Sequence, residues 1–151
     1  MYDFPATKLT YLADGWYMTV HQSTVSKRWI WSVYDGKYKF SCMSVACGTA
    51  TEVECVLNFD AVRNRLTASL TTLSGNCLIP GDWQVEFSRN SAELWTWRIK
   101  RSGKMVCCCR MSGLVSRRRC KQSFERFAVA CGWRKRSIFH RKWGYLYEKF
   151  S

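Results

Sequence analysis

The sequence is poor in proline and has no long apolar run. Only two of its 151 residues are proline, while 47% are apolar and 15% are aromatic, a composition that excludes a disordered chain. No stretch approaches the ~20 consecutive apolar residues needed to span a bilayer. The first residues have neither the basic stretch nor the apolar run that directs secretion. We therefore expect one folded domain, with or without an appendage, in a reducing intracellular compartment, either cytoplasm, nucleus or both.

Motifs for catalysis are also missing. The chain has no phosphate-binding glycine loop, no zinc-protease helix motif and no serine elbow. Its only histidines are His21 and His140, and nothing in the sequence places a cysteine beside either of them as an activated nucleophile. We expect a protein that is not an enzyme.

Acidic side chains are nearly absent from the last third of the chain. Residues 1–98 carry nine basic and nine acidic side chains and are neutral, whereas residues 99–151 carry fifteen basic and two acidic ones. The whole net charge of +13 therefore lies in the last third. This segregation predicts a neutral scaffold with an end that binds polyanions.

Cysteine is abundant, but its pattern matches no standard zinc finger. Nine cysteines occur, an odd number, and no C-x-x-C spacing is found, which argues against a closed disulfide framework in a chain without a secretion signal. Cys107 and Cys109 would share one face of a strand, and further cysteines and a histidine follow. Zinc takes four such ligands in a tetrahedron. Buried apolar thiols or a redox-sensitive cluster are the alternatives. The candidate zinc ligands are Cys107, Cys109, Cys120, Cys131 and His140.

Turn signals at short intervals predict strands over most of the chain. Asp14-Gly15 and Asp35-Gly36 each separate two short apolar segments, as in β-hairpins. Alternation of apolar and polar residues predicts further strands over 52–59, 66–72, 83–88, 92–100 and 105–110. The fold class is mainly β: an antiparallel meander, closed as a barrel or stacked as a sandwich, over residues 1–112.

The pattern changes after residue 115. Apolar residues recur at spacings of three to four over 120–133, which predicts one short amphipathic helix that Gly132 ends. We expect no long helix before this point. Residues 113–151 thus form a basic, aromatic C-terminal segment, which we expect either to pack on the β domain or to extend from it.

This segment is the best candidate for a binding site. Arginine forms bidentate hydrogen bonds with phosphate and stacks on bases. Aromatic rings interleaved with basic residues suit the binding of single-stranded or looped RNA. We expect a nucleic acid, with RNA favoured over DNA, as the partner. A targeting signal or a surface for a host protein is the alternative, and attraction to an anionic membrane is a third. The candidate nucleic-acid-binding residues are Arg117, Arg118, Arg119, Lys121, Trp133, Arg134, Lys135, Arg136, Phe139, Arg141, Lys142 and Trp143.

Two tryptophan pairs have the spacing of residues on one face of a strand. They are Trp29 with Trp31 and Trp95 with Trp97. Such pairs either pack across strands in a core or line a stacking groove on an exposed sheet face. The packing interpretation is the more common one for tryptophan.

The chain also resembles two known families. The stretch Asp14-Gly15-Trp16-Tyr17, within a meander followed by a helix, is similar to the first-strand signature of lipocalins, although lipocalins place one residue between Gly and Trp. That resemblance implies a carrier of a small molecule. In its size, cysteine content and basic charge the chain is similar to the movement and silencing-suppressor proteins of sobemoviruses. This compositional resemblance implies a viral accessory protein that binds zinc, suppresses RNA silencing and helps the virus to spread.

Overall fold

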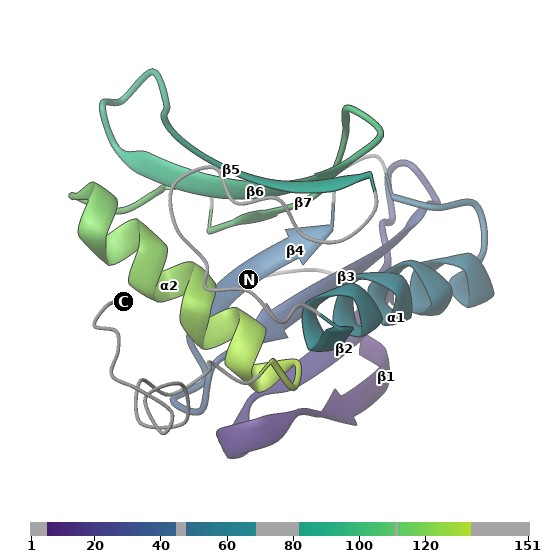
Figure 1. The fold of residues 1–151 in the computed structure, drawn as a ribbon. Helices are drawn as coiled ribbons and strands as arrows, with labels where there is room; N and C mark the ends of the chain where they lie inside the picture. Colours follow the sequence, from purple (N-terminus) through teal and green to yellow (C-terminus); the bar gives the residue numbers. More distant parts are fainter. Residues whose placement is uncertain (1–5, 45–47, 69–81, 111, 134–151) are drawn as a thin grey trace.

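One antiparallel sheet of seven strands carries the fold, and two α-helices lie on one of its faces (Figure 1). The computed structural model describes residues 6–44, 48–68, 82–110 and 112–133. Across the sheet the strands follow the order β1-β2-β3-β4-β7-β6-β5. Because β1 and β5 are its edges, the sheet is open: the mainly β prediction is confirmed, and the barrel alternative does not apply to the described strands. The strands are β1 (Ala6–Tyr11), β2 (Tyr17–Gln22), β3 (Trp29–Tyr34), β4 (Phe40–Ser44), β5 (Trp83–Arg89), β6 (Trp95–Arg101) and β7 (Lys104–Cys109).

Both predicted Asp-Gly hairpins are present. β1 and β2 are joined through the short 3-10 helix η1 (Ala13–Gly15), in which Asp14 and Gly15 both have positive φ angles of 59° and 78°. In the β3–β4 turn the Asp35 carboxylate accepts the backbone N–H of Lys37 at 2.8 Å and that of Lys39 at 3.0 Å. Asp supports such turns because its short side chain satisfies backbone donors that the turn leaves unpaired.

The prediction of strands over 52–59 and 66–72 is wrong for the described residues, because helix α1 (Glu52–Ala68) occupies this part of the chain. The buried residues Cys55, Phe59, Val62 and Leu66 recur every three to four positions, which is helical spacing. Val53, by contrast, is 67% exposed. The alternating pattern had grouped inward-facing and outward-facing residues as one strand face. Residues 69–72 lie outside the described residues.

The predicted C-terminal helix is present as α2 (Arg117–Ala130), three residues earlier than predicted. Its apolar stripe consists of buried Cys120, Phe124, Phe127, Ala128 and Ala130. The Trp97 ring contacts both phenylalanines, at 5.2 Å from Phe124 and 5.3 Å from Phe127 between ring centroids. α2 is therefore held on the sheet by aromatic packing.

The core lies between the sheet and the two helices. Strand pairing places Val33, Cys42 and Cys109 side by side on the face that the helices cover. Two tryptophans anchor the helices there: Trp31 Nε1 donates to Asn58 of α1 at 2.8 Å, and Trp97 Nε1 donates to Ser123 of α2 at 3.1 Å. Trp31 and Trp97 are thus core residues. Among the described segments neither helix has the length and apolar character to cross a membrane.

Candidate nucleic-acid interface

The first turn of α2 carries positive charge where a helix favours negative charge. Its N-cap is Ser116, whose side-chain oxygen accepts the backbone N–H of Arg119 at 3.1 Å. Arg117, Arg118 and Arg119 follow the cap and are exposed. Backbone N–H groups and the helix dipole make this end of a helix positive, so acidic residues stabilise it and basic ones do not. Three consecutive arginines therefore place positive charge where the helix dipole does not favour it.

Helix α1 shows the stabilising arrangement in the same protein. There Thr51 Oγ1 accepts the backbone N–H of Glu54 at 3.1 Å, and Glu54 Oε1 accepts the backbone N–H of Thr51 at 3.2 Å. This reciprocal pair is a capping box. In α2 the position that corresponds to Glu54 is Arg119. The second helix thus has the serine of a capping box without its carboxylate.

A basic cleft of about 390 Å³ opens beside this part of α2. α2 forms one wall, and the other is formed by the first residues of β4, the residue after β7 and the residue after η1. The basic cleft has four positively charged side chains from three segments, together with two aromatic rings. These six residues are Lys39, Arg110, Arg119, Arg126, Trp16 and Phe40.

The four basic side chains of the cleft are not neutralised. In the described part of the chain no ion pair involves Lys39, Arg110, Arg119 or Arg126. The acid that lines the cleft is Asp35, whose carboxylate is used by the turn that it stabilises. A concave surface with an excess of positive charge attracts anions.

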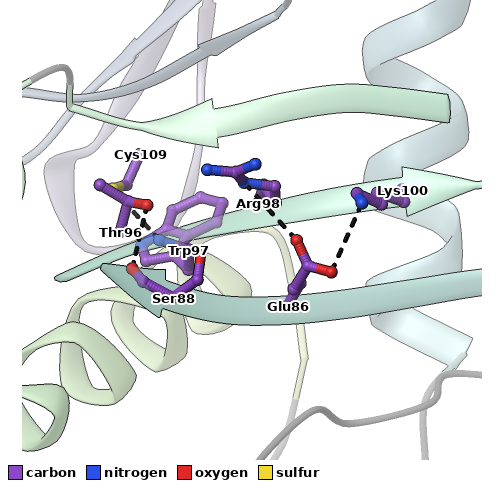
Figure 2. A network of polar contacts seen from close by, with 7 residues as sticks. All are labelled: Glu86, Ser88, Thr96, Trp97, Arg98, Lys100 and Cys109. Atoms are coloured by element: carbon purple, nitrogen blue, oxygen red, sulfur yellow. Dashed lines mark hydrogen bonds and ion pairs between the residues drawn. The ribbon is translucent and has the colours of Figure 1, made fainter. Parts of the chain in front are cut away.

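The basic residues of β6 differ, since a carboxylate already lies between them. Figure 2 shows Glu86 of β5 between Arg98 and Lys100, at 3.8 Å from the first and 3.4 Å from the second. Arg89 and Arg101 are likewise paired with Glu93 and Asp82. These paired residues are therefore less available to a ligand than the basic residues of the cleft.

Three of the four predicted binding residues of α2 line one shallow depression, while the fourth, Arg119, lines the basic cleft. Arg117, Arg118 and Lys121 line a shallow depression with Gln122 and Glu125, next to the basic cleft. The guanidinium of Arg117 also lies 6.0 Å from the ring centre of Trp95, which Arg89 approaches at 5.9 Å. The predicted residues Arg134, Lys135, Arg136, Phe139, Arg141, Lys142 and Trp143 lie outside the described residues.

Trp133 does not present its ring to a base. It is 2% exposed and belongs to the core cluster, so the prediction that it stacks on bases is wrong for this structure. The physical reason is that the chain turns back at Gly132, whose φ of +115° suits glycine. The backbone N–H of Trp133 donates to the carbonyl of Ala128 at 2.9 Å. This turn returns the chain to the core, where the Trp133 ring is buried.

The predicted cysteine ligands share the interface between the sheet and α2. Cys107, Cys109, Cys120 and Cys131 are all buried there. Burial raises the pKa of the Cys120 and Cys131 thiols to about 12 each, and it raises that of Cys107 well above 9. No three His, Cys, Asp or Glu side chains within the described ranges form a group that could hold a metal ion. His140 lies outside those ranges, so zinc stays a prediction.

Sequence reasoning missed Arg126 of α2 and the whole wall of the cleft that faces α2. Trp16, Lys39, Phe40 and Arg110 come from three segments in the neutral part of the chain or at its border. Charge counting drew attention to the C-terminal third alone. The two hairpins could have indicated that residues 16 and 40 share one end of the sheet, but no local pattern predicts which helix covers that end.

Comparison of the chain with protein-family models, with curated proteins and with solved structures finds no match in any of the three.

Proposed function

We propose that the protein is a non-enzymatic RNA-binding protein whose phosphate-binding surface is the basic cleft and the exposed arginine face of α2. The observation that carries the proposal is the group of four unpaired positive side chains that three segments bring into one cavity. The four positive charges outnumber the one acidic residue that lines the cleft, Asp35, and a concave surface with such an excess attracts anions.

The chemistry of the cleft favours a nucleic acid over a simple polyanion. Trp16 and Phe40 line it beside the positive charges, and both rings are half-buried rather than enclosed. Aromatic rings stack favourably on nucleic-acid bases, and heparin-like polymers have no bases. The volume of about 390 Å³ lies within the range of pockets for small organic molecules, so one nucleotide can enter it.

The position of α2 supports the same conclusion. The first-turn N–H groups of a helix and its dipole attract phosphate. Here that end of α2 adjoins a cavity in which Arg119 and Arg110 already provide positive charge. RNA binding is also the property that silencing suppression would need, the activity implied by the resemblance to sobemovirus proteins.

The test removes two positive charges inside the cleft and compares them with two outside it. The cleft variant is Lys39→Gln/Arg126→Gln, and the control is Lys27→Gln/Arg65→Gln, which also loses one Lys and one Arg. Each single-strand phosphate contact contributes roughly −0.7 to the slope of log affinity against log salt. The cleft variant should therefore show a slope less negative by about 1.4, whereas the control should keep the slope of the unaltered protein. Equal salt slopes for the two variants would indicate that RNA binds outside the basic cleft.

A second candidate function is a protein-interaction module, in which the basic C-terminal residues would serve as an intracellular targeting signal. The observation in its favour is the outer face of α1, where Val53 is 67% and Leu57 is 59% exposed, one helical turn apart. If this function holds, Arg117→Ala/Arg118→Ala/Arg119→Ala should relocate a fluorescent fusion and leave RNA affinity unchanged. A drop in RNA affinity with unchanged location would favour the first proposal.

A further inference from the structure

A row of aromatic residues crosses the open face of the sheet, on the side away from the helices. Strand pairing places Tyr11 of β1 opposite Tyr17 of β2, Tyr17 opposite Tyr34 of β3, and Tyr34 opposite Phe40 of β4. Met18 and Val33, the neighbours of Tyr17 and Tyr34, point into the core, so Tyr17 and Tyr34 point away from it. Tyr11 pairs with Tyr17, and Phe40 pairs with Tyr34 after an irregularity in the strand register, so both lie beside them on this face. Tyr38, in the β3–β4 turn, contacts Tyr17 at 5.8 Å between ring centroids. We call these five residues the aromatic row.

Packing within the sheet explains only part of the aromatic row. The rings of Tyr17 and Tyr34 stack at 5.1 Å between centroids, and Tyr34 lies 6.0 Å from Phe40, as in cross-strand pairs that stabilise sheets. Tyr11 and Tyr38, however, are 74% and 76% exposed. Their rings gain little from burial, and exposed aromatic surface of this extent calls for another explanation.

The backbone conformation of Tyr38 also indicates that this residue has a role beyond packing. Its φ is +64°, in the left-handed region that asparagine and glycine adopt at lower cost than an aromatic residue. Its side chain is nonetheless a large ring that stands in solvent. Asp14, Lys27, Glu93 and Ser102 also have positive φ, but among these non-glycine residues of the described chain Tyr38 alone is aromatic.

The aromatic row and the basic cleft lie on opposite sides of the sheet, because α2 forms one wall of the cleft, and they meet at one end of the sheet. Phe40 belongs to both, and Lys39, which follows Tyr38, lines the cleft together with Arg110. The row crosses three spacings between strands, or roughly 14 Å, which suits two or three bases. A single strand of RNA could therefore place its phosphates along the charges of the cleft and its bases along the rings. A duplex could not, since its bases are stacked on one another.

We propose that the aromatic row is a base-stacking surface, with Tyr11 and Tyr38 as its exposed contacts, and that it selects single-stranded over double-stranded RNA. This proposal rests on the proposed function of the basic cleft. The class of ligand is RNA with unpaired bases, which stack on the aromatic rings, whereas the phosphates contact the positive charges.

The test replaces the two exposed rings by residues that suit their backbone. The variant is Tyr11→Thr/Tyr38→Asn, in which threonine fits an edge strand and asparagine fits a positive φ, so the fold should be kept. Tyr11→Phe/Tyr38→Phe is the control that keeps both rings. Fluorescence anisotropy with a labelled single-stranded RNA of about 12 nucleotides and with its duplex gives the affinities.

We expect the variant to bind the single strand roughly 5- to 150-fold more weakly for each stacked base that it loses. Its salt slope and its duplex affinity should stay as in the unaltered protein, and the phenylalanine control should bind the single strand normally. Single-strand affinity within twofold of the unaltered protein would overturn the stacking proposal, and the cleft would still stand if the salt slope persists. A change of oligomeric state with unchanged RNA affinity would make the row a self-association surface and overturn it as well. No RNA binding by the unaltered protein would overturn both proposals.

Discussion

Arg119 is the residue at which stability and binding should oppose each other. It occupies the third position of α2, where the corresponding residue of α1, Glu54, completes a capping box. Arg119→Glu should therefore form the missing bond from the side chain to the backbone N–H of Ser116. It should also place a negative charge at the positive end of the helix.

The magnitude follows from these two contributions. A favourable charge in the first turn contributes about 0.3–1 kcal/mol, and the capping bond adds a similar amount. We expect a free energy of unfolding that is greater by about 1 kcal/mol, or a Tm higher by roughly 2–4 °C for a chain of this length. RNA affinity should fall roughly tenfold or more, because one charge-assisted contact with phosphate is lost and a carboxylate enters the cleft.

Thermal unfolding at low and high salt, with RNA titrations in parallel, measures both effects. Arg119→Gln is the matched variant, because glutamine can make the capping bond without adding charge. It should be stabilised less than Arg119→Glu at low salt, and the two should converge at ~1 M salt, where charges are screened. A lower Tm for Arg119→Glu, or unchanged RNA affinity, would refute the view that stability is sacrificed here for an anion.

Three further predictions concern the fold. Gly113→Ala should destabilise more than Gly103→Ala, roughly 2–4 against about 1 kcal/mol in urea unfolding, since both have positive φ but an added Cβ meets an atom at 2.8 Å only at Gly113. Stability should fall above pH 9 by about 1.4 kcal/mol per pH unit for each thiol such as Cys42 or Cys107, because burial raises their pKa in the folded state and the unfolded chain releases these protons first; stability that is flat from pH 9 to 10.5 in a urea titration would contradict this. Phe124→Ala should cost about 3–5 kcal/mol and loosen α2, and far-UV circular dichroism together with urea unfolding would reveal a smaller effect if the packing were unimportant.

The sheet could be predicted because its signals are local. Asp14-Gly15 and Asp35-Gly36 set both N-terminal hairpins, and alternation along residues 83–88 marked β5, where Val85 and Phe87 face the core. Each of these signals depends on residues within a few positions of one another, as does the apolar stripe of α2. For such elements, pattern and structure agree because burial on one face is the shared cause.

Helix α1 could not be predicted from alternation, although a better signal was present. Val53, Cys55, Leu57 and Phe59 alternate with polar residues, yet in the helix Cys55 and Phe59 are buried while Val53 and Leu57 are exposed. The capping residues of α1 identify its start, because Thr51 and Glu54 have the spacing of a capping box. A short apolar run fits both the strand period and the helix period, so the capping box is the better evidence for a helix here.

The residues of the basic cleft could be predicted only in part. Counting charges identified Arg119, but Lys39 and Phe40 join it only because the strand order places β4 beside β7 and the start of β4 faces α2 across the cleft. For Trp133 the prediction fails in the other direction. Its position among basic residues in the sequence predicts an exposed ring, but the chain turns at Gly132 and the ring is buried. Long-range pairing and the direction of single side chains are beyond what local patterns convey.

The most direct test of the RNA-binding surface is the affinity of the unaltered full chain for a labelled single-stranded RNA at ~50 and ~200 mM salt. Four phosphate contacts in the basic cleft predict binding that is roughly 50-fold weaker at the higher salt, with Arg119→Glu well below the unaltered protein at both. Binding that does not change with salt, or no binding at ~50 mM, would contradict the assignment of the cleft to RNA.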